Sequence, residues 1–141
     1  MFNKILSSLN ELSEMVRTQA SSLGEGARER SEKLIDEWLK VFPKLEVYGL
    51  KITSFALSAA ISPALEVEMV GKHVDFTPAR LRQIMGENPR SPAILSVMNT
   101  IKTAYALHRK SYADLEEPLI VKIKVRLSPE IKVFIGKPLI E

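Results

Sequence analysis

ISPALEVEMVGK occupies residues 61–72 and LSPEIKVFIGK occupies residues 127–137, so one sequence motif occurs twice in almost the same form. Each copy places a Ser-Pro turn between two β-patterned runs and closes on Gly-Lys, the first with one more residue before its glycine. Ser and Pro are typical of turns, and strongly β-forming runs beside a turn are typical of strands. The repeat therefore predicts two β-hairpins of the same kind.

Around the first turn, the pattern predicts a strand from Leu45 to Ile61 and a second strand from residue 65 to residue 70. The apolar parity changes within the first strand, which indicates a β-bulge or bend near Thr53-Ser54. In the second strand Glu66 and Glu68 alternate with apolar residues, as expected for a strand with one buried face.

Around the second turn, residues 119–127 and 130–135 predict the other hairpin. Its first strand alternates apolar residues with Lys122, Lys124 and Arg126. Opposite charges on facing strands stabilise a sheet, whereas like charges oppose pairing. We therefore expect strand 65–70 beside strand 119–127, either within one chain or between two copies.

Helical patterns precede both hairpins. A helix is expected from about Ala27 to Phe42, where Pro43 ends it. Thr77-Pro78 and Ser91-Pro92 look like two helix starts, each with a hydroxyl cap followed by proline. The first of these helices should end near Gly86, and the second should reach about Arg109.

The order αββ thus occurs twice between residues 27 and 141. It predicts an α+β domain of duplicated αββ units, with a four-stranded, mainly antiparallel sheet, helices on one face and approximate twofold symmetry between the halves.

Residues 1–20 predict a separate amphipathic helix, followed by a linker at residues 21–26 that contains two glycines. Its partner is open between its own domain, another protein and a lipid surface. Lys4 and Arg17 are offset by Glu11 and Glu14, so peripheral membrane contact is not favoured. The interaction residues of this helix are Phe2, Ile5, Leu6, Leu9 and Leu12.

Composition excludes several classes of protein. The 141 residues are 45% hydrophobic and 26% charged, which suits one folded domain with an appendage. The net charge of +3 is spread among acidic residues and aromatic residues are 6%, a poor fit to nucleic-acid binding. There is no cysteine, secretory signal or membrane-spanning run, so we expect a soluble, cytoplasmic protein.

No catalytic, cofactor or metal motif occurs, and we predict a protein that is not an enzyme. His73 and His108 lack ligand spacing, so His73 is interpreted as an ordinary loop residue and His108 as a cation at a helix C-terminus. Glu66 and Glu68 share a strand face and are interpreted as solvated, not as an acid-base pair.

The apolar residues suggest two functions, and a third stays open. The first is a non-catalytic binding or assembly module, a homo-oligomer joined through the N-terminal helix and the sheet edges. The alternative is a carrier of an apolar small molecule or lipid, in a cavity between the central helix and the sheet. The third is a small enzyme with no readable motif. The candidate pocket residues are Trp38, Phe55, Leu57, Met98, Ile101 and Tyr105.

Overall fold

The computed structural model describes residues 25–59 and 61–140 of the chain. Its elements, in chain order, are α2 (Glu25–Tyr48), β1 (Lys51–Ser58), β2 (Ala64–Gly71), the 3-10 helix η2 (His73–Phe76), α3 (Pro78–Glu87), α4 (Pro92–Lys110), β3 (Leu119–Val125) and β4 (Pro129–Ile135).

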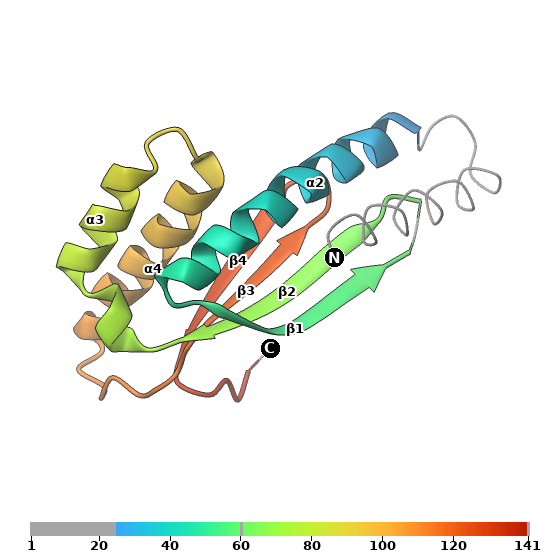
Figure 1. Ribbon diagram of the computed structural model, residues 1–141. Helices are drawn as coiled ribbons and strands as arrows, with labels where there is room; N and C mark the ends of the chain where they lie inside the picture. The colour runs from blue at the N-terminus through green and yellow to red at the C-terminus, as the bar shows by residue number, and fades with distance from the viewer. Residues whose placement is uncertain (1–24, 60, 141) are drawn as a thin grey trace.

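The four strands form one antiparallel sheet in the order β1-β2-β3-β4, and the helices lie on one face of it (Figure 1). The expected α+β class and antiparallel sheet are therefore confirmed. The duplication of the two αββ units stays a prediction. The predicted helix at residues 1–20 and residues 21–24 of the predicted linker lie outside the described residues.

The pairing of β2 with β3 follows the charges. Glu66 lies opposite Lys124 and Glu68 opposite Lys122, and both are ion pairs, with N–O distances of 3.4 Å and 3.9 Å respectively. This confirms the strand neighbours that the sequence predicted, here within one chain. The charged pairs and the apolar pairs between them lie on opposite faces, because side chains alternate along a strand.

The expected bulge in β1 is also present. The register between β1 and β2 shifts between Ile52 and Ser54, so Thr53 is the extra residue. Its hydroxyl donates to the backbone oxygen of Glu68 at 3.2 Å and to Oε1 of Glu68 at 3.0 Å. The bulge lets Ile52 and Phe55 lie on the same face although they are three residues apart.

The core lies between this face and the helices. Side chains from α2 and α4 pack against those of β2 and β3, and most are fully buried. From the helices these are Ile35, Trp38, Leu39, Phe42, Ile94, Val97, Met98 and Ile101, and from the strands Leu65, Val67, Met69, Val121, Ile123 and Val125.

Two helix starts match the sequence pattern. The hydroxyl of Thr77 accepts a hydrogen bond from the backbone N–H of Arg80, and that of Ser91 accepts one from the N–H of Ile94, each at 3.3 Å. Each cap is followed by proline, which has no N–H to leave unsatisfied in the first turn.

The predicted end of the first helix at Pro43 is wrong, and so is the strand expected from Leu45. Helix α2 passes through Pro43 and continues to Tyr48, because Leu45 extends its apolar face and is completely buried. Burial of a leucine stabilises by about 1.5–3 kcal/mol, which is comparable with the cost of an interior proline, about 3 kcal/mol.

Gly49 is the residue that ends α2. Its φ of +119° lies in the left-handed region, which glycine adopts readily. The N–H of Gly49 donates to the oxygen of Glu46 and that of Leu50 to the oxygen of Leu45, both at 3.1 Å. This pair of bonds is the Schellman motif, and it satisfies carbonyls of the last helical turn. Strand β1 therefore begins at Lys51.

Candidate interaction surface and polar network

The predicted pocket residues separate into two groups. Trp38, Met98, Ile101 and Tyr105 lie in the buried core and are at most 8% exposed. Phe55 and Leu57 lie on β1, where Leu57 packs at the margin of the core and Phe55 is 40% exposed. The apolar ligand cavity between helix and sheet stays a prediction.

The outer strand β1 carries an apolar surface that the described helices leave uncovered. Phe55 lies opposite Val67 and Leu57 opposite Leu65, so both face the helix side of the sheet. Val67 and Leu65 are at most 2% exposed, in contrast to Phe55. We call Phe55 and Leu57 the β1 patch. Ile61, in the turn that follows, is 58% exposed.

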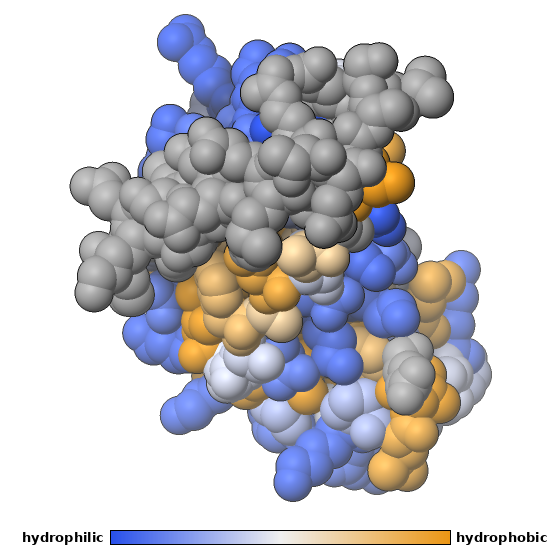
Figure 2. Space-filling model, turned by 90° about the vertical axis from the view of Figure 1, so that its right-hand side faces the viewer, coloured by the Kyte–Doolittle hydropathy of each residue, from blue (hydrophilic) through white to orange (hydrophobic). Residues whose placement is uncertain are grey.

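The end of the sheet where the β1–β2 turn lies also exposes apolar side chains. Figure 2 looks at this end and shows hydrophobic residues among hydrophilic ones. Ile61 in the first hairpin turn and Leu127 in the second are both more than half exposed. Such exposure on a folded domain is typical of contact surfaces when several apolar residues adjoin.

The opposite face of the sheet is a shallow groove of about 410 Å³ with a mixed charge. Its charged lining comprises Glu66, Glu68, Lys122, Lys124, Glu130 and Lys132. Between β2 and β3 each glutamate faces a lysine, and Lys124 also faces Glu130 of β4, whereas Lys122 faces Lys132. The ion pairs between β2 and β3 engage Lys122 and Lys124, so these charges are not free to bind a ligand. This arrangement is typical of a solvated sheet face stabilised by cross-strand pairs.

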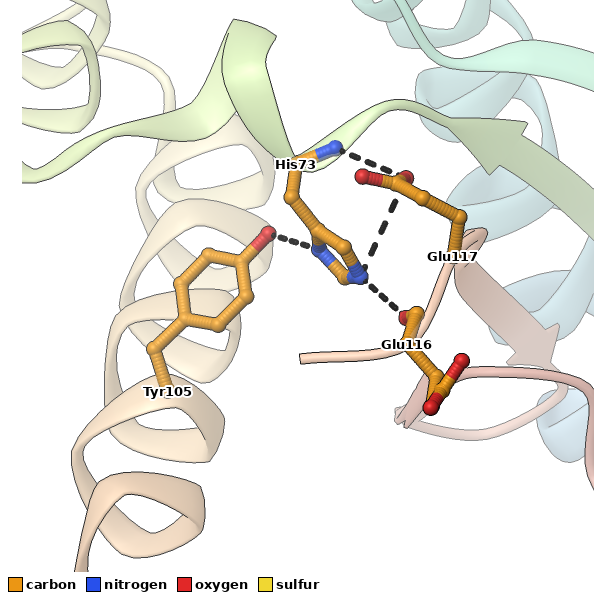
Figure 3. A network of polar contacts seen from close by, with 4 residues as sticks. All are labelled: His73, Tyr105, Glu116 and Glu117. Atoms are coloured by element: carbon orange, nitrogen blue, oxygen red, sulfur yellow. Dashed lines mark hydrogen bonds and ion pairs between the residues drawn. The ribbon is translucent and has the colours of Figure 1, made fainter. Parts of the chain in front are cut away.

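The most organised polar cluster is centred on His73 (Figure 3). The interpretation of His73 as an ordinary loop residue is wrong, because its side chain is buried at 5% exposure in η2. Its Nδ1 lies 2.7 Å from the hydroxyl of Tyr105, and its Nε2 lies 2.6 Å from the backbone oxygen of Glu116. The sequence signal was weak, since only the position of His73 directly after a buried strand points to burial.

The partners of His73 determine its tautomer. A carbonyl oxygen only accepts, so Nε2 carries a hydrogen and donates to Glu116. In the neutral ring Nδ1 then accepts a hydrogen bond from the hydroxyl of Tyr105. The carboxylate of Glu117 accepts from the backbone N–H of His73 at 3.2 Å. Burial, and then the charge of Glu117, raise the pKa of Tyr105 above its ordinary value.

This network connects three separate segments of the chain. Tyr105 belongs to α4, His73 to η2, and Glu116 and Glu117 to the segment before β3. Both ring nitrogens of His73 are engaged within the protein, so the ring lacks a free position for a base or a metal ligand. The network therefore acts as a clamp that joins the helical layer to the start of β3.

The other histidine lies where the sequence predicts. His108 is in the last turn of α4 with Arg109 and Lys110, a favourable place for cations. No group of three or more His, Cys, Asp and Glu side chains that could hold a metal occurs within residues 25–59 and 61–140.

In the same described ranges, no helix combines the length and the apolar character needed to cross a membrane. Comparisons of the chain with protein-family models, with curated proteins and with solved structures found no match.

Proposed function

We propose that this protein is a non-catalytic assembly module that self-associates through the outer strand β1. The observation that carries the proposal is the difference between the two outer strands. Strand β1 has no charged residue from Ile52 to Ser58, and most of its side chains are exposed. Strand β4 begins with Pro129 and carries Glu130 and Lys132.

Outer strands present unpaired backbone groups, and proteins normally protect them with charges, prolines or bulges. In β4 proline and two charged residues discourage a further strand. In β1 the protective features, Lys51 and the bulge at Thr53, both lie at the start of the strand. The rest of β1 is therefore the better site for addition of a strand, a common way in which sheets bind partners.

A second copy of β1 fits this edge. If two antiparallel copies pair around Ala56, Phe55 of each copy lies opposite Leu57 of the partner subunit. Aromatic and aliphatic pairs of this kind contribute about 0.2–1 kcal/mol each beyond the backbone hydrogen bonds. No like charges meet, because the run from Ile52 to Ser58 is uncharged. The predicted duplication of the αββ unit bears on this proposal. Each hairpin supplies one outer strand, and β1 is uncharged beyond its first residue whereas β4 carries Glu130 and Lys132.

Native mass spectrometry with light scattering tests the proposal. We expect a mass that is a multiple of 15.8 kDa and that rises with concentration. Ala56→Lys should shift the protein to the monomer, because two lysines would meet at the centre of the pairing. The fold should persist, since Ala56 is exposed and lies opposite Glu66. Thr103→Lys, on an exposed position of α4, is the control and should keep the wild-type mass.

A wild-type protein that stays monomeric at high concentration would contradict the proposal, and so would an Ala56→Lys variant with the wild-type mass. The same spectra examine the alternative function. A monomer that retains a stoichiometric apolar compound would favour the carrier of an apolar ligand instead.

A further inference from the structure

The helix-side face of the sheet is covered unequally. Above β2 and β3 the side chains of Leu65, Val67 and Ile123 are at most 2% exposed. Above the described part of β1, Phe55 is 40% exposed although it belongs to the same face. The two helices α2 and α4 thus cover the inner strands and leave Phe55 of the β1 patch exposed beside α2.

The start of α2 lies at one end of this uncovered surface. The hydroxyl of Ser31 in α2 lies 2.7 Å from the hydroxyl of Ser62 in the β1–β2 turn, and both side chains are buried. The first turns of α2 are therefore held at the end of the sheet where β1 finishes. The N-terminal segment is thus joined to the described structure at the end of the β1 patch nearest Ile61.

The length of the N-terminal segment matches the surface. A helix of residues 2–16 would be about 22 Å long at 1.5 Å per residue. The stretch from Phe55 in β1 to Ile61 in the following turn spans at most about 20 Å at 3.3 Å per residue. Residues 17–24 can extend to about 26 Å, which is sufficient for the chain to reverse its direction.

We propose that residues 2–16 dock as an amphipathic helix on the β1 patch of their own chain, antiparallel to α2. The apolar residues Phe2, Leu6 and Leu9 face the sheet in this arrangement. With residue 16 placed near Ile61, Leu9 comes to lie over Leu57 and Phe2 over Phe55. The polar face, with Lys4, Glu11 and Glu14, remains in water.

This inference does not depend on the proposed self-association. The helix covers side chains on one face of β1, whereas self-association uses the backbone edge of the same strand. Docking on the same chain is favoured over docking on a second copy, because the segment is covalently joined to α2 at this end of the sheet. An anionic lipid surface is a poorer partner, because Lys4 and Arg17 are balanced by Glu11 and Glu14.

Disulfide trapping in the full-length chain tests the inference, and the chain has no cysteine of its own to interfere. Leu9→Cys combined with Leu57→Cys should form an intramolecular disulfide under mild oxidation. Intact-mass measurement should show a single chain that has lost two thiol hydrogens. Ser7→Cys with Leu57→Cys is the control, because residue 7 is about 160° around the helix from residue 9 at 100° per residue. It should keep its thiols.

A disulfide between two chains would place the helix on a second copy and overturn the inference, as would equal trapping in the control or none in either protein. Loss of the disulfide with co-sedimentation on phosphatidylserine-containing vesicles would indicate a lipid surface instead. As a second measurement without cysteines, Leu9→Glu should shift the methyl resonances of Leu57, and Ser7→Glu should leave them unchanged. Unshifted resonances in Leu9→Glu would overturn the inference as well.

Discussion

Removal of the Tyr105 hydroxyl tests whether the clamp around His73 stabilises the fold. In Tyr105→Phe, Nδ1 of His73 loses the donor that lies 2.7 Å away, and both residues are at most 8% exposed. A buried acceptor without a partner costs about 1–3 kcal/mol. The ring volume hardly changes, so no cavity adds to this loss. We therefore expect the free energy of unfolding at neutral pH to fall by about 1–3 kcal/mol.

The pH dependence of the same variant provides a second, independent signature. The pKa of Tyr105 is raised in the folded protein from the ordinary 10.0 that it has when unfolded. Below pH 10 both states hold the proton, and the stability that it contributes is fully present. As the pH rises above 10, the unfolded chain releases its proton first, so the wild type loses up to about 1.4 kcal/mol per pH unit through this group.

Tyr105→Phe has no proton to lose at this position, so the difference in stability between wild type and variant should become smaller between pH 10 and about pH 11. Urea unfolding, measured at neutral pH and across this alkaline range, gives both quantities. Tyr112→Phe is the matched control, because Tyr112 is 94% exposed and its substitution should leave the free energy of unfolding at neutral pH unchanged. Equal stability of the two variants at neutral pH, or a difference that stays constant above pH 10, would refute the reasoning.

Two further substitutions test the sheet and the end of α2. Glu68→Lys places a lysine opposite Lys122 and should lower the free energy of unfolding by about 0.2–1 kcal/mol. The double variant Glu68→Lys with Lys122→Glu should restore most of this loss. A Glu68→Lys variant with unchanged stability in urea unfolding would contradict the register of β2 and β3. Gly49→Ala should cost about 1–3 kcal/mol, because φ is +119° and the new Cβ would lie 3.3 Å from Oδ2 of Asp75. Gly86→Ala, which has open space around it in α3, should instead raise the thermal midpoint, and equal effects of the two glycine variants would argue against strain at residue 49.

The sheet was the part of the fold that the sequence predicted best. A strand with one buried face alternates its side chains, and the alternation of glutamates in β2 and lysines in β3 specifies which strands attract each other. The parity change at Thr53 was equally readable, because a bulge shifts the apolar face by one residue.

The polar network around His73 was harder to predict from the sequence, because its residues come from distant parts of the chain. His73 and Tyr105 are 32 residues apart, and nothing in the residues beside His73 indicates a donor from α4. Phe55 presents the opposite case. Its apolar character suggested burial, yet the described helices leave it 40% exposed because they cover the inner strands of the sheet.

By itself, the sequence determined the local elements whose signals lie within a few residues: the turn at Ser62-Pro63, the two capped helix starts, the bulge and the charged strand pair. The second hairpin turn lies at residues 126–128, because Pro129 already belongs to β4 and pairs with Val125. Tertiary structure decided the features that depend on what packs against them. Burial of Leu45 carried α2 through Pro43, and the approach of α4 to the segment before β3 enclosed His73. The physical reason is that dihedral preferences and charge alternation act between near neighbours, whereas burial depends on surfaces brought together by the whole fold.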